Sequence, residues 1–137
     1  VLVVSANPTG FEAWRISQFT TAQLADPSIS GPDATPANDG VANFVKYALG
    51  LQAFVPAPAS LLSIQVSNEE ARVFYQRPSV APDVSYRLEA STDLLSWAQA
   101  GTTQQSIFTG TNGLQLWEGQ YIGPSSSSRF FRLSLER

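Results

Sequence analysis

The sequence predicts a mainly β fold: an antiparallel β-sandwich of about seven or eight strands, immunoglobulin- or fibronectin-like, preceded by a small helical cap. From residue 61 onward apolar and polar residues alternate, and turn signals divide the alternation at the roughly 8–12-residue spacing typical of sandwiches. Before residue 58 apolar residues recur at helical spacing. At 137 residues the chain can bury a sizeable core. We expect an N-terminal strand in residues 1–10, the cap in 11–58 and the sandwich in 59–137, as one structural unit.

The first expected helix begins beside Thr9. Thr9 and Glu12 have the spacing of a capping box, in which each side chain accepts a hydrogen bond from the other residue's backbone N–H. The apolar residues that follow are Phe11, Trp14, Ile16 and Phe19. Thr20 and Thr21 then predict the start of a further helical turn, which the pair Asp26-Pro27 ends.

A second helix is expected after a loop. Residues 28–40 are rich in Ser, Gly, Pro, Asp and Asn, a composition that indicates a loop. From Val41 to Leu49 the apolar residues follow the i, i+3, i+4, i+7 pattern of one helix face. Gly50 stands where a left-handed C-cap favours glycine, so the helix should end there.

Period-two alternation predicts the strands of the second part. The alternating segments are 62–67, 71–76, 84–91, 106–109, 114–122 and 130–135. The N-terminal residues Val1, Leu2, Val3 and Val4 are also strongly β-prone. Three interpretations of this segment stay open: an edge strand of the same sandwich, the tail of a preceding domain, or a strand donated to a neighbouring molecule.

The composition argues against catalysis. The chain has no Cys and no His, which excludes disulfides, thiolate nucleophiles and Ser-His-Asp arrangements. We therefore expect no enzyme and no cofactor. Its basic residues are scattered singly in a chain of net charge −3, so nucleic acid is not an expected partner. The apolar runs are far shorter than the roughly 20 residues of a membrane span.

The chain also lacks Met, which suggests processing from a longer precursor. Its Lys-poor composition, rich in Ser, Thr, Gln and Ala, favours a secreted or cell-surface location.

Four motifs, in order, resemble a C-terminal β-sandwich module found on large exported proteins of Verrucomicrobia and related bacteria. Residues 33–50 (DATPANDGVANFVKYALG) are similar to its EF-hand or dockerin-like loop and helix. Residues 11–27 resemble its short W-R-x-x-x-F helix, and residues 84–97 resemble its Y-x-V-E-x-S-x-D-L-x-x-W segment. Residues 129–133 (RFFRL) resemble its closing strand. The resemblance covers the chain from about Phe11 to its end.

The resemblance implies a calcium-type loop, but this loop has lost ligands. A loop of this kind takes oxygen ligands from positions 1, 3, 5, 7, 9 and 12, with glycine at 6. With Gly40 as that glycine, the ligand positions are occupied by Thr35, Ala37, Asp39, Val41, Asn43 and Lys46. Ala37 supplies no side-chain oxygen, and Lys46 places a cation where the closing carboxylate belongs. We expect no bound metal, and we hypothesise that the Lys46 ammonium pairs with Asp39 or Asp33 in its place.

These observations favour a non-catalytic structural or attachment module, self-assembling into a fibre through its N-terminal strand. Its expected partners are further copies of itself or cell-surface components. The alternative is a carbohydrate-binding module appended to a secreted enzyme. For that alternative Trp117 is the best candidate for a sugar-stacking side chain, because it lies between Leu116 and Glu118 in an alternating strand.

Overall fold

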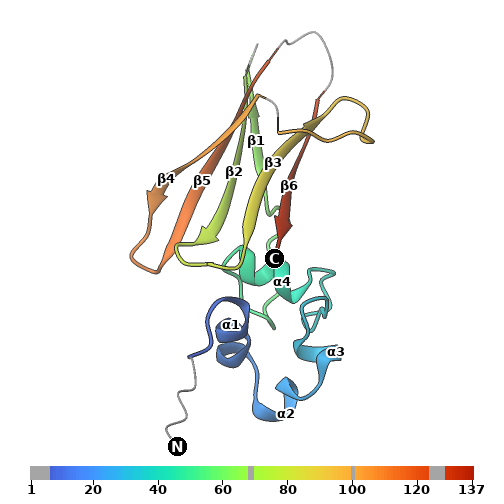
Figure 1. Ribbon diagram of the computed structural model, residues 1–137, viewed down its shortest axis with the longest axis vertical. Coiled ribbons are helices and arrows are strands. Elements are labelled where there is room, and N and C mark those ends of the chain that lie inside the picture. Colours follow the sequence, from blue (N-terminus) through green and yellow to red (C-terminus); the bar gives the residue numbers. More distant parts are fainter. Residues whose placement is uncertain (1–6, 68–69, 100, 124–128) are drawn as a thin grey trace, which may run out of the picture.

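The computed structural model describes residues 7–67, 70–99, 101–123 and 129–137. The fold is mainly β, with a helical part at one end of the molecule and two antiparallel sheets at the other (Figure 1). The helices are α1 (Gly10–Gln18), α2 (Thr21–Leu24), α3 (Pro27–Ser30) and α4 (Asn43–Ala48). The strands are β1 (Ser63–Val66), β2 (Glu70–Pro78), β3 (Ser85–Ser91), β4 (Thr102–Thr109), β5 (Leu114–Ile122) and β6 (Phe130–Glu136).

The described residues form six strands, so the prediction of seven or eight is wrong for this part of the chain. Four strands make one sheet in the order β1-β2-β5-β4, and β3 pairs with β6 in the other. After β3, side chains of Ser91 and Asp93 take up backbone N–H groups that a strand would pair: Asp93 Oδ1 lies 2.8 Å from the nitrogens of both Leu95 and Ser96. The pairing of this stretch with β3 is therefore limited to a single bridge between Ala90 and Ala98.

The two sheets face each other through the side chains that the alternation predicts. Val73 and Tyr75 of β2 and Leu88 of β3 are almost fully buried. Gly119 of β5 allows the close approach, because a Cβ atom there would lie 2.4 Å from Leu88 Cδ2. Tyr75 also stacks on Tyr86 across the gap between the sheets, at 6.3 Å between ring centroids. The inward faces of β2 and β3 are therefore as predicted.

An aromatic cluster fills the helical part. Phe11 and Tyr47 are 1% and 4% exposed, and their ring centroids lie 5.6 Å apart. Trp14 packs against both rings. Ile16, which the sequence places with this face, is half exposed. The cluster joins α1 to α4, because Phe11 and Trp14 come from α1 and Tyr47 from α4.

The start of α1 differs from the prediction. Thr9 is the N-cap residue, but its side chain makes no capping hydrogen bond, and Glu12 instead pairs with Arg15. The N–H of Phe11 donates to Asp83 Oδ2 at 2.9 Å, so a residue distant in sequence replaces the local capping box. The further turn expected at Thr20 and Thr21 is present as α2, and Thr20 forms a capping box with Gln23.

The boundaries of two further elements differ from the predicted ones. The segment 28–40, predicted as loop, begins inside α3, whose first turn is capped by Asp26 and carries Pro27 at its start. The second long helix is shorter than the expected Val41–Leu49, because Ala42 has extended backbone angles and acts as the N-cap. Gly50 has φ +68° and ends α4 as predicted, with its N–H donating to the Tyr47 carbonyl.

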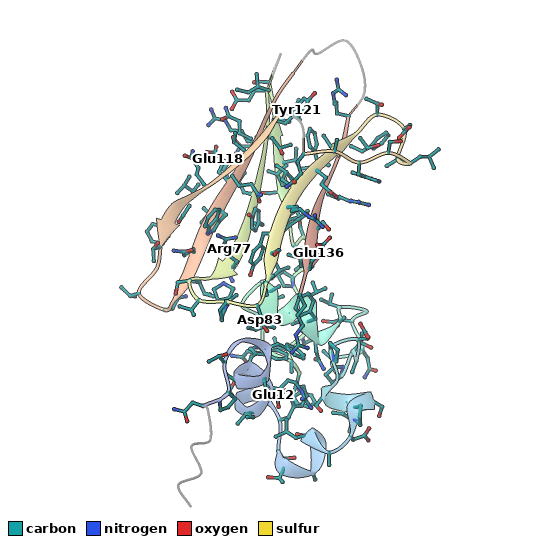
Figure 2. The ribbon with its side chains drawn as sticks, in the orientation of Figure 1. Glu12, Arg77, Asp83, Glu118, Tyr121 and Glu136 are labelled. Carbon is teal, nitrogen blue, oxygen red and sulfur yellow. The ribbon has the colours of Figure 1, made fainter. Side chains whose placement is uncertain are left out.

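Asp83 joins the helical part to the sheets. It lies in the loop between β2 and β3, and Figure 2 shows it at the level where strands and helices meet. Besides capping α1, it accepts a hydrogen bond from the Tyr47 hydroxyl. Burial alone would raise the pKa of Asp83, but the hydrogen bonds from Tyr47 and Phe11 outweigh it and hold that pKa below its ordinary value. Tyr86 of β3 adds a second link by donating to the Ala48 carbonyl at 2.7 Å.

Gly10 and Gly40 test the importance of the Asp83 junction. Both have positive φ, +60° and +74°, so alanine costs about 1–2 kcal/mol of backbone strain at either position. At Gly10 the added Cβ would also lie 2.4 Å from the Asp83 carboxyl carbon, whereas at Gly40 it meets nothing within 4 Å. We expect Gly10→Ala to lower the free energy of unfolding in urea by about 2 kcal/mol more than Gly40→Ala does, since the carboxylate must abandon two hydrogen bonds. Equal losses in the two variants would contradict this role of Asp83.

Candidate functional site

The loop that resembles a calcium site turns sharply at its predicted glycine. Asn38 and Gly40 both have positive φ, at 55° and 74°, and Asp39 lies between them. Within this turn Asp39 Oδ1 accepts the N–H of Val41 at 3.0 Å, and its other oxygen faces Lys46 of α4. The loop geometry therefore presents one carboxylate to the helix that follows it.

Lys46 occupies the interior of this site. Its side chain is fully buried, and its Nζ lies 2.8 Å from Asp39 Oδ2. The same ammonium donates to the carbonyl oxygens of Ala53 at 3.2 Å and Val55 at 2.8 Å. All three ammonium protons thus have an oxygen partner, as a buried cation requires. Of the two partners that the sequence allowed, the structure pairs Lys46 with Asp39 and leaves Asp33 exposed.

Both carboxylate oxygens of Asp39 also have hydrogen-bond partners. In addition to Lys46, its Oδ2 accepts the N–H of Ala57 at 2.8 Å. The hydrogen bond from Lys46, followed by that from Ala57, lowers the pKa of Asp39 well below its ordinary range. Asp39 is therefore ionised at neutral pH and supplies the negative charge that balances the buried ammonium.

The other predicted ligand positions have separate structural roles. Asn43, at position nine, is fully buried and donates from Nδ2 to the carbonyls of Ile29 and Gly31, both at 2.9 Å. The Thr35 carbonyl accepts the N–H of Asn38. Ala37 contributes no polar side chain. Among the residues that the structure describes, no three carboxylates, histidines or cysteines gather as a metal site would need.

Sequence reasoning missed three groups that contact the Lys46–Asp39 pair. These are the backbone groups of Ala53, Val55 and Ala57, in a segment whose prolines predicted only a linker. No side-chain pattern marks such groups, because every residue has a carbonyl oxygen. The arrangement holds the loop, α4 and the segment leading to β1 together without a metal.

Trp117, the predicted sugar-stacking residue, is half buried. It pairs with Tyr75 in the β2–β5 ladder, so its ring lies on the side of the sheet that faces β3. The guanidinium of Arg77 lies 3.2 Å from the centre of its ring, and its Nε1 donates to Gln115. One ring face is therefore occupied, and sugar stacking on Trp117 stays a prediction, which polysaccharide pull-down with Trp117→Ala would test.

The open edges of the two sheets form a second candidate site. On one side β3 is covered, since Ala98 bridges its backbone and side chains of Thr102 and Gln104 donate to its carbonyls. On the other side the outer edges of β1 and β6 receive no backbone pairing from the described residues. Figure 1 shows these two edges on the same side of the molecule, away from the β4–β5 hairpin.

Apolar side chains accompany the open edge of β1. Ile64 and Val66 pair with Val73 and Ala71, so they lie on the same inward face as those buried residues. They are nevertheless 50% and 76% exposed. The described residues thus leave the inward face of this edge uncovered. The predicted assembly strand, Val1 to Val4, lies outside the described residues.

Neither a protein-family model nor a curated protein matches the sequence. No helix within the described ranges has the length and apolar character needed to span a bilayer. The function must therefore be argued from the residues and their geometry.

The ion pair predicts strong coupling between Lys46 and Asp39. Lys46→Met leaves the Asp39 carboxylate without its buried cation, and Asp39→Asn leaves the ammonium without its charge partner. We expect each variant to lower the melting temperature by about 5 °C or more. The double variant, which removes both charges, should lose clearly less than the sum of the two. Additive losses would show that the two side chains do not stabilise each other.

Because the Lys46 ammonium occupies this site, we also predict that calcium does not change the stability of the protein. The Lys46 ammonium sits among the oxygens that would face the ion, so a divalent cation would meet a positive charge there. We expect the same melting temperature in excess calcium and in excess chelator. A calcium-dependent rise of several degrees would overturn the interpretation of the loop as metal-free.

Proposed function

We propose that the chain is a non-catalytic structural or attachment module of an exported protein, which associates by accepting a β-strand at the open β1–β6 side. The observation that supports this most directly is the exposure of Ile64 and Val66 on the inward face of an unpaired edge. An edge strand with free backbone groups and uncovered apolar side chains offers both parts of strand addition: main-chain hydrogen bonds and pockets for alternate side chains.

The sequence of β1 supports this use. Edge strands of proteins that stay monomeric usually carry a charge, a proline or a bulge that blocks pairing. Residues 61–66 (LLSIQV) contain no charge and no proline. An added strand that buried Ile64 and Val66 would gain about 1.5–3 kcal/mol for each side chain fully covered. The edge of β1 is therefore better suited to pairing with another strand than to remaining exposed to solvent.

Strand addition also accounts for the strand count. The six strands of the described residues form sheets of four and two, so the smaller sheet cannot cover the larger one. One or two further strands on the β1–β6 side would give the seven- or eight-stranded immunoglobulin- or fibronectin-like sandwich that the sequence pattern favours. The resemblance to a module of large exported proteins agrees with a supporting role of this kind.

The donated strand that we propose is the segment Val1 to Val4 of a neighbouring copy. It is apolar on both faces of a strand, as expected of a segment buried between sheets. Because donor and acceptor are different parts of the chain, the contact is head-to-tail and propagates into a fibre unless the rotation closes.

Two variants test assembly. Val66 and Val80 are similarly exposed, at 76% and 74%, but Val66 lies on the open edge and Val80 in the loop after β2. We expect the full chain to form concentration-dependent polymers in sedimentation and electron microscopy. Val66→Lys and deletion of residues 1–6 should abolish them, whereas Val80→Lys should not. Polymers that persist without residues 1–6, or a full chain that stays monomeric at high concentration, would refute the proposal.

A further inference from the structure

The guanidinium of Arg77 lies close to two aromatic rings, one from each sheet. Its guanidinium carbon is 3.2 Å from the centre of the Trp117 ring of β5 and 4.3 Å from that of the Tyr86 ring of β3. Figure 2 shows it toward the end of β2 that faces the helical part. Both rings are themselves fixed, because Trp117 Nε1 donates to Gln115 and the Tyr86 hydroxyl to Ala48. The guanidinium is thus held in one orientation.

This cation differs from most others in the chain because it has no carboxylate partner among the described residues. Six other basic residues each pair with an acid: Arg15, Lys46, Arg72, Arg87, Arg132 and Arg137. Burial lowers the pKa of Arg77, which shows that its surroundings solvate the positive charge poorly. Its side-chain N–H groups make no hydrogen bond within the described residues, so the contacts of the guanidinium are the two rings.

A small hollow lies beside Arg77. Its volume is about 120 Å³. The residues that line it are Arg77, Pro78, Ser79, Ala81, Val84 and Tyr86, none of them acidic. The nearby Asp83 carboxylate is engaged with Phe11 and Tyr47 and does not line the hollow. A group that enters the hollow therefore meets a single positive charge beside apolar and hydroxyl groups.

We propose that this hollow binds a carboxylate group, held by the edge of the Arg77 guanidinium. A guanidinium edge matches the two oxygens of a carboxylate in a bidentate geometry. A single positive charge in a chain of net charge −3 suits a monovalent carboxylate rather than a divalent phosphate. The proposal does not depend on strand addition, because the hollow lies at the end of β2 and involves neither β1 nor β6.

Titrations at constant ionic strength test this site. The probes are acetate, glucuronate, glucose and inorganic phosphate, and the signals are the Arg77 Nε–H and Trp117 indole N–H resonances. We expect saturable shifts with acetate and glucuronate, with dissociation constants in the range of about 1–50 mM, and none with glucose. Tighter binding of glucuronate than of acetate would show that the carboxylate of a sugar acid is recognised. Shifts that stay linear with both carboxylates, or tighter binding of phosphate, would overturn the proposal.

Substitutions assign the binding to Arg77. Arg132 is the matched control, since it also lies over a tryptophan, Trp97, but already pairs with Glu89. Arg77→Lys keeps the charge and the stem but loses the bidentate edge, so we expect acetate binding to weaken about tenfold. Arg132→Met should leave it unchanged. The Trp117 indole resonance reports binding in both variants, and equal affinity in Arg77→Lys and wild type would refute the role of Arg77.

Discussion

The fold of the helical part depends on one buried positive charge. A fully buried ammonium is tolerated only where a counter-charge and hydrogen-bond acceptors surround it, and around Lys46 these come from two separate segments. Asp39 comes from the loop, and the carbonyls of Ala53 and Val55 come from the segment that leads to β1. The requirement to satisfy one charge therefore brings together the loop, α4 and the segment that leads to β1.

The position of the sheets follows from the same contact. Lys46 orients α4, and the next residue, Tyr47, then reaches Asp83 in the loop between β2 and β3. Asp83 in turn accepts the N–H of Phe11 and starts α1. Burial and the bond to Asp83 both raise the pKa of Tyr47, so its hydroxyl stays protonated and remains a donor. The carboxylates of Asp39 and Asp83 thus link the loop, the helices and the sheets.

The sheets, by contrast, leave interactions unfilled within the described residues. The helical part pairs its buried cation and caps the starts of α2 and α3 with its own side chains. In the sheets, β1 has an unpaired edge with Ile64 and Val66 uncovered, and Arg77 has ring contacts but no carboxylate. Within the described residues the sheets are therefore the less complete half of the structure. Both proposed sites lie in the incomplete half.

The sequence by itself determined the local features. Alternation located β2, β3 and β6, and the cation at Lys46 led to an expected ion pair with Asp39 or Asp33, of which the structure has the first. Those inferences need only neighbouring residues and the chemistry of their side chains. The tertiary structure decided that Asp83 rather than Thr9 caps α1, that backbone carbonyls complete the Lys46 site, and that the outer edges of β1 and β6 are unpaired among the described residues. These depend on contacts between segments far apart in the chain, often through backbone groups that every residue shares, and no local pattern records them.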